Sequence, residues 1–163
     1  METGIWSEPH PHVLGEPVAI GRLVVRSEHA LVAVRSLEAS ARGCGFLVKA
    51  VARRGSLPEE VWAGILGEFG PPGPDGLPVR SDLRLGVDVP GGYRGRTFET
   101  GGSAGTDGET YDAERLVWLS PLPPPGPFEF TVEWPSLGLE RTALTLDGAA
   151  VRRAAERAEP YWP

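Results

Sequence analysis

The chain has 163 residues, a length typical of one domain, and hydrophobic residues make up 40% of it, enough for a buried core. The formal net charge of −6 disfavours nonspecific binding to nucleic acid or to an anionic membrane, because both need a positive field. A single cysteine excludes an internal disulfide, and the N-terminus lacks the basic and apolar regions of a signal peptide. We therefore expect a soluble cytoplasmic protein.

Residues 1–16 carry polar and turn-forming residues without periodicity, and we interpret them as an extended arm that Trp6 anchors. Residues 17–163 are interpreted as one domain. It begins with three runs rich in Val, Leu and Ile that short turns separate, at 18–27, 30–39 and 45–53. Such spacing predicts a meander of antiparallel strands.

A helix is predicted next. The pattern from Ser56 to Glu59 resembles a capping box with proline in the first turn. The apolar residues that follow lie on one face of a helix: Val61, Trp62, Ile65, Leu66 and Phe69. Gly64 and Gly67 weaken this helix, and residues 70–78, rich in glycine and proline, predict a loop.

The segment 83–112 predicts a β-hairpin followed by a mobile loop. Leu83, Leu85, Val87 and Val89 alternate with less apolar residues, a strand pattern, and we expect 93–100 to be the hairpin partner of this strand. Residues 101–112 are rich in glycine, and the span 99–114 contains five acidic and no basic residues. We interpret 101–112 as a solvated loop.

The C-terminal third predicts three more strands, at 116–119, 128–134 and 139–146, and a helix that Asp147 caps and that runs through Ala158. Residues 121–127, here called the proline bridge, link the first two of these strands without pairing, because proline has no amide donor. The predicted fold is mainly β: a two-layer antiparallel β-sandwich, immunoglobulin-like or related, with one or two short α-helices.

Four motifs in the second half resemble those of a family of small actinobacterial β-rich proteins. They are the strand Leu83–Val87, the Gly-rich segment Gly101–Gly108, the block Trp118–Pro127 and the Glu-Trp-Pro of Glu133–Pro135. The resemblance covers about half the chain and implies no known activity. Ser120 departs from it, because family members often have a second Trp there, so the resemblance does not imply an aromatic platform.

No catalytic motif occurs in the sequence. His10 and His12 lack an obvious third metal ligand, Asp107, Glu109 and Asp112 do not have the spacing of a calcium loop, and no Lys follows the glycines as in a phosphate loop. We predict no catalytic residue, no metal site and no cofactor.

The proline bridge and its two flanking tryptophans are the candidate binding residues: Trp118, Pro121, Leu122, Pro124 and Trp134. The bridge contains a PxxP spacing that could dock an aromatic groove of another protein as a polyproline helix. The alternative is that the bridge only crosses from one sheet to the other and is partly covered by the two tryptophans.

These observations favour a non-enzymatic module that acts through contacts with an unidentified protein partner or with itself, at an apolar patch or an exposed sheet edge. We expect neither nucleic acid nor a membrane as partner. The alternative function is a small-molecule or carbohydrate-binding domain, or a modest hydrolase that uses surface carboxylates.

Overall fold

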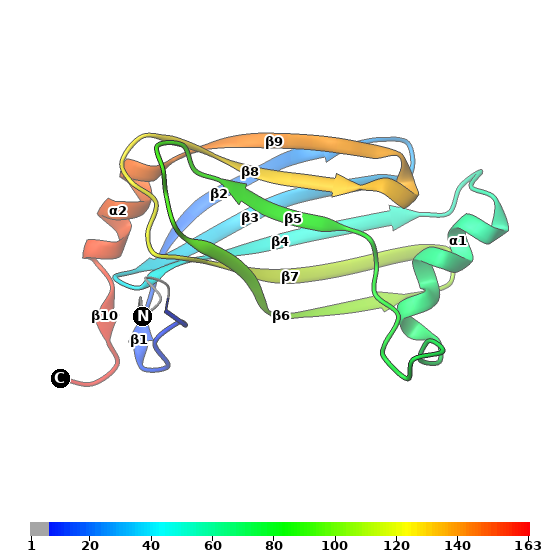
Figure 1. The fold of residues 1–163 in the computed structure, drawn as a ribbon, viewed down its shortest axis with the longest axis horizontal. Helices are drawn as coiled ribbons and strands as arrows, with labels where there is room; N and C mark the ends of the chain where they lie inside the picture. Colours follow the sequence, from blue (N-terminus) through cyan, green and yellow to red (C-terminus); the bar gives the residue numbers. More distant parts are fainter. Residues whose placement is uncertain (1–6) are drawn as a thin grey trace.

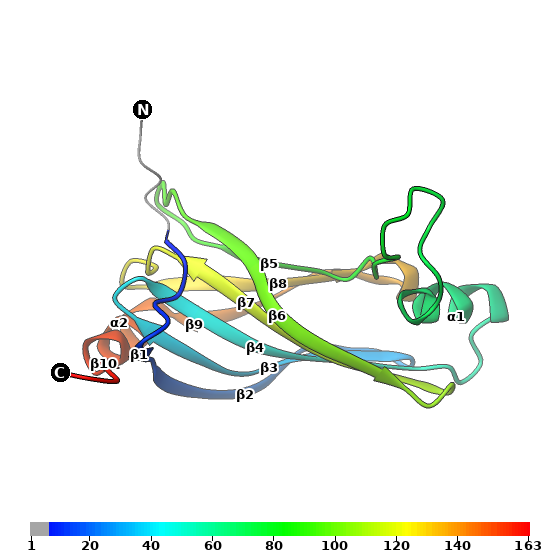
Figure 2. The ribbon, with the colours of Figure 1, turned by 90° about the horizontal axis from the view of Figure 1, so that it is seen from below.

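The computed structural model describes residues 7–163, so the expected anchor Trp6 lies outside the described residues. Two antiparallel sheets stack face to face (Figures 1 and 2). The larger has the order β2 (Glu16–Arg26), β3 (Ala30–Ser40), β4 (Gly43–Arg53), β7 (Thr110–Ser120) and β6 (Arg96–Thr106). The smaller has the order β5 (Arg84–Asp88), β8 (Pro127–Trp134) and β9 (Leu139–Asp147). The predicted two-layer β-sandwich is confirmed.

Short elements close the two ends of the sandwich (Figure 1). Helix α1 (Glu59–Ile65) and the 3-10 turn η1 (Leu66–Phe69) lie at one end, while α2 (Gly148–Glu156) lies at the other. A second 3-10 turn, η2 (Pro135–Leu137), connects β8 to β9. Near the termini, β1 (Val13–Leu14) pairs with β10 (Glu159–Pro160), so part of the predicted N-terminal arm is fixed to the C-terminal end of the chain.

The core lies between the sheets because alternate residues of each strand point inward. Phe46 on β4 contacts Phe128 and Phe130 on β8, with ring centroids 6.4 and 5.1 Å apart. All three rings are buried. These contacts join the two layers, and the helices complete the core with Trp62 and Ile65 from α1 and Val151 and Ala154 from α2.

Cys44 lies within this core with no exposed surface, and burial raises the pKa of its thiol to about 12. The folded protein therefore keeps the neutral thiol at pH values where the unfolded chain loses the proton. Stability from this group is complete below the unfolded pKa, near 9, and is lost as the pH rises toward 12. The loss amounts to about 1.4 kcal/mol per pH unit in this window.

We predict that Cys44→Ala flattens the alkaline loss of stability. The free energy of unfolding, measured by urea titration at about pH 8 and about pH 11, should fall less in the variant by roughly 2–3 kcal/mol. Tyr111, whose pKa burial also raises, titrates in both proteins and cancels in the comparison. Equal losses in the two proteins would contradict this role of Cys44.

The predicted meander and the three C-terminal strands are confirmed, but the helix signals were only partly right. Pro58 occupies the N-cap of α1 and no side chain caps it, so Ser56 forms no capping box. The helix ends at Ile65 and continues as η1, consistent with the two glycines that weaken it. At α2, the Asp147 side chain accepts a hydrogen bond from the Ala149 N–H as predicted, and the helix ends at Glu156 instead of Ala158.

Two predictions for 93–112 were wrong. Strand β6 is not the hairpin partner of β5; it pairs with β7 in the other sheet. Residues 101–106 are not a loop but the second half of β6, and only 107–109 separate it from β7. Asp107 closes this turn by accepting hydrogen bonds from the N–H groups of Glu109 and Thr110, which lower its pKa.

The Gly-rich segment forms a strand by pairing with β7, and acidic residues of β7 pair with basic residues of β3 and β4. Lys49 on β4 pairs with Asp112, and Arg35 on β3 pairs with Glu114 at 2.9 Å. Gly102 approaches β7 closely, since a Cβ there would lie 2.6 Å from the Glu114 carbonyl oxygen. Pairing with β7 thus offsets the low strand propensity of glycine.

Candidate functional site

The proline bridge crosses from β7 in the larger sheet to β8 in the smaller one and is bonded to the body of the protein. The Pro121 carbonyl accepts a hydrogen bond from the Tyr93 hydroxyl, and the Pro123 carbonyl accepts one from Arg152 Nε at 2.7 Å. Pro121 and Leu122 are half-buried, while Pro124 is exposed. The bridge is a fixed crossover, as the alternative interpretation stated, and only part of the PxxP segment faces solvent.

The two flanking tryptophans do not lie on one surface. Trp118 lies on the outer face of β7, and its Nε1 donates to the Ser7 carbonyl at 2.7 Å. Trp134 lies in the core between the sheets with no exposed surface, 5.9 Å from the ring of Tyr111. Trp134 therefore cannot contact a partner of the folded protein, and the five predicted residues are not brought together.

Ser120, the departure from the family pattern, is fully buried at the start of the bridge. Its hydroxyl donates to the Arg42 carbonyl at 2.6 Å and accepts a hydrogen bond from the Ser7 N–H at 2.8 Å. It fixes the end of β7 and offers no aromatic platform.

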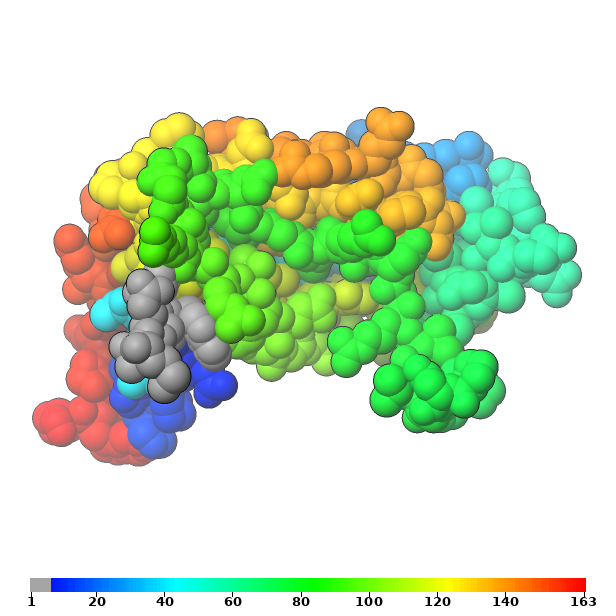
Figure 3. All heavy atoms as spheres, viewed as in Figure 1, coloured from blue at the N-terminus to red at the C-terminus, as the bar shows by residue number. Residues whose placement is uncertain are grey.

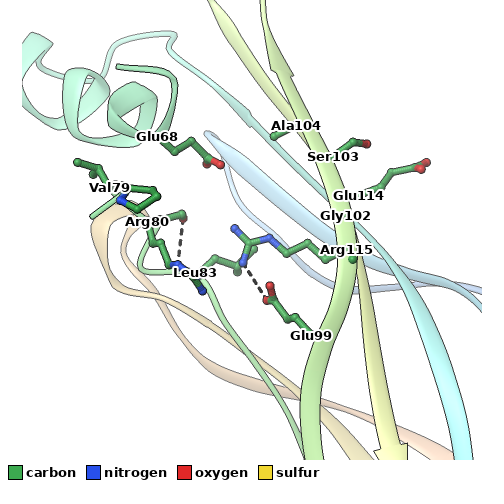
Figure 4. A pocket seen from close by; sticks show the side chains of 13 residues that line it. Glu68, Val79, Arg80, Leu83, Glu99, Gly102, Ser103, Ala104, Glu114 and Arg115 are labelled. Carbon is green, nitrogen blue, oxygen red and sulfur yellow. Dashed lines mark hydrogen bonds and ion pairs between the residues drawn. The ribbon is translucent and has the colours of Figure 1, made fainter. Parts of the chain in front are cut away.

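The structure contains a cavity of about 510 Å³ where the sandwich opens beside β6. Its walls come from the loop 78–83, from Glu68 on η1, and from β6 and β7 (Figure 4). On the cavity side β6 presents the small residues Gly102 and Ala104, so no long side chain fills the cavity at these two positions. In Figure 3 the lobe that contains this loop projects beside the sheet and leaves the surface indented between them.

Polar side chains from three elements converge at this cavity (Figure 4). Arg115, only 16% exposed, points beneath β6 and pairs with Glu99 at 3.1 Å. Glu68 lines the cavity, and its Oε1 is buried without a hydrogen bond within residues 7–163. Tyr111 lies close to Glu68 and Arg115 but does not line the cavity. Burial, with a smaller effect from the nearby Glu68 carboxylate, raises the pKa of Tyr111 to about 12.

The strand beside the cavity is an unprotected sheet edge. Within the described residues β6 pairs only with β7, and Gly101–Thr106 is exposed throughout. Edge strands in stable monomers usually carry charges, prolines or bulges that prevent pairing with another chain. The six residues from Gly101 to Thr106 contain neither charge nor proline, although a bulge lies just before them.

The other outer strands are protected in the usual ways. Strand β2 contains Pro17 and two register shifts. Strand β5 has five residues and carries Arg84 and Asp88, while β9 carries Glu140 and Arg141. The contrast indicates that the open edge of β6 is a specific feature of this fold.

The sequence-based prediction missed this site because it began the strand of β7 at residue 116 and assigned the second half of β6 to a loop. A signal was present: Tyr111, Ala113, Arg115, Val117 and Leu119 are alternate residues, and all five point inward in the structure. The charge of Arg115 interrupts the apolar pattern. The convergence of Glu68 with β7 depends on the tertiary fold and leaves no local signal.

No protein-family model, curated protein or solved structure matches the chain. Within residues 7–163, no helix is long and apolar enough to cross a membrane. Over the same residues, no three His, Cys, Asp or Glu side chains are grouped as metal ligands.

Proposed function

We propose that the protein is a soluble contact module that binds an extended segment of another polypeptide along the open edge of β6. The observation that carries this proposal is the run Gly101–Thr106, an exposed outer strand without charge or proline. Alternate backbone N–H and C=O groups of such a strand point away from its neighbour and are free to pair with an added strand.

The neighbouring cavity supports the same function. Strand addition uses backbone hydrogen bonds for affinity and pockets beside the strand for specificity. An added strand would run about 4.8 Å from β6, and its inward side chains would enter the cavity beneath the loop 78–83. The resemblance to the actinobacterial family stays a prediction and adds nothing to this argument.

We predict that a proline in the centre of β6 abolishes binding without unfolding the protein. Successive amides of a strand point in opposite directions, so one of Ser103→Pro and Ala104→Pro removes a donor that faces solvent, and the other removes a bond to β7. The variant that removes the solvent-facing donor is recognised by its nearly unchanged free energy of unfolding. Fluorescence anisotropy with extended peptides of about ten residues measures the binding.

The matched control alters the same residue and keeps the amide donor: Ser103→Ala for Ser103→Pro, or Ala104→Ser for Ala104→Pro. It should bind the peptides as the wild-type protein does. Peptide binding should also slow hydrogen exchange of the Gly101–Thr106 amides. Unchanged binding by the solvent-side proline variant, or no protection of these amides, would contradict the proposal.

A second candidate function uses the same cavity for a small polar ligand, since its volume lies in the range of ligand pockets, about 300–1,000 Å³. Hydrolysis would need two carboxylates in opposite roles. Glu99 and Glu114 are each paired with an arginine, so Glu68 is the one cavity carboxylate with an oxygen that lacks a partner within residues 7–163. Thermal-shift screening with sugars and nucleotides tests this candidate, because a bound ligand raises Tm.

A further inference from the structure

The chemistry of the cavity also restricts which segment can bind at β6. This step rests on the proposed strand addition and concerns the side chain that an added strand would place beside Gly102 and Ala104, where β6 leaves the cavity open. In Figure 4 this position lies between β6 and the loop 78–83, on the side of the cavity that Glu68 and Arg115 face.

One hydrogen-bond acceptor in this part of the cavity has no donor within the described residues. The Arg115 guanidinium is neutralised by Glu99, and Glu114 is paired with Arg35. Glu68 forms no ion pair with any described residue, and its Oε1 is buried without a hydrogen bond within residues 7–163. A buried carboxylate oxygen without a donor is costly, so a donor in the cavity would stabilise the complex.

Tyr111 lies beside this acceptor but does not line the cavity. Its side chain has no exposed surface, and its hydroxyl, which can itself donate, lies close to Glu68 and Arg115. The acceptor that faces the cavity is therefore the Glu68 carboxylate, which takes hydrogen bonds from N–H donors. A guanidinium or an ammonium group provides them and also carries the charge that Glu68 favours.

The surface near the edge of β6 also carries negative charge, which matches a positively charged partner. Of the five acidic residues between positions 99 and 114, three are ion-paired, while Asp107 and Glu109 at the tip of the β6–β7 hairpin form no ion pair with a described residue. On the opposite wall Arg80 is exposed to solvent, where its charge is screened. The approach to the edge thus favours a basic segment.

We propose that the partner of β6 is an extended basic segment of another protein, which places an arginine or lysine side chain in the cavity against Glu68. An acidic or purely apolar segment would leave the Glu68 oxygen without a donor. A second copy of this chain is a poor partner, because its β6 would bring a second acidic hairpin to the same edge.

The test uses synthetic extended peptides of about ten residues that are identical except for a central Arg, Leu or Glu. We expect the Arg peptide to bind roughly tenfold or more tightly than the Glu peptide, the ratio that about 1.4 kcal/mol gives. Glu68→Gln should remove most of this preference. Glu60→Gln is the matched control, because Glu60 is exposed on α1 and does not line the cavity.

The two proposals can fail separately. If the peptides protect the β6 amides but bind equally well with Arg and Glu, or if the preference persists in Glu68→Gln, the basic-partner proposal is wrong and strand addition stands. If no peptide binds at β6, both are wrong. A sedimentation experiment that shows a dimer through β6 would assign the edge to a second copy and overturn the basic-partner proposal.

Discussion

Phe130→Ala is expected to lower the free energy of unfolding by about 3–5 kcal/mol, the largest effect of any single change considered for this protein. Phe130 has no exposed surface and lies on β8, the central strand of the smaller sheet. Its ring contacts Phe46 on the facing sheet at 5.1 Å, so removal of the ring leaves a cavity between the two layers. Chemical denaturation measures the loss.

A stable domain has a total free energy of unfolding of only about 5–15 kcal/mol, so Phe130→Ala could reduce the folded population severely. Phe130→Leu keeps most of the apolar volume and should give a smaller, measurable loss. Glu129→Ala is the matched control on the same strand, because Glu129 points to the other face of β8; we expect a change within about 0.5 kcal/mol. Equal losses for residues 129 and 130 would contradict the assignment of the inner face.

Gly148→Ala is expected to destabilise the protein by about 2–3 kcal/mol, although alanine is the better helix former. Gly148 is the first residue of α2, and its N–H donates to the Gly126 carbonyl at 2.7 Å. A Cβ at this position would lie 2.1 Å from the Pro124 carbonyl oxygen and 2.8 Å from the Gly126 carbonyl oxygen. Both are backbone atoms of the proline bridge, so the bridge must move.

Thermal and urea unfolding of Gly148→Ala measure this effect. Gly105→Ala is the matched control, since a Cβ at Gly105 meets no atom within 4 Å, and its stability should stay within about 0.5 kcal/mol of wild type. Helix propensity alone predicts a gain of up to about 1 kcal/mol for Gly148→Ala. A gain would show that the close approach of α2 to the bridge does not constrain the fold.

The strands that carry a strong apolar pattern were predictable because burial on one face imposes a period of two on the sequence. The run from Phe128 to Trp134 is β8, and the three N-terminal runs are β2, β3 and β4. The Asp147 cap was also predictable, because a cap acts within a few residues of the chain.

The second half of β6, residues 101–106, was not predictable from its own residues. Glycines and acidic residues favour a solvated loop when they are considered alone. This segment forms a strand by pairing with β7, and the ion pairs of Asp112 and Glu114 on β7 with Lys49 and Arg35 connect residues more than 60 positions apart. The open edge, and with it the proposed binding site, follows from this pairing.

The amino-acid sequence by itself determined the fold class, most of the strands and the position of the crossover, because alternation, turn residues and prolines act locally. The tertiary structure alone decided which strand lies at the edge, and it brought Glu68 and Arg115 together at one cavity. The physical reason is that sheet order and charge pairing depend on the free energy of the whole packed chain. Local sequence patterns do not determine this free energy.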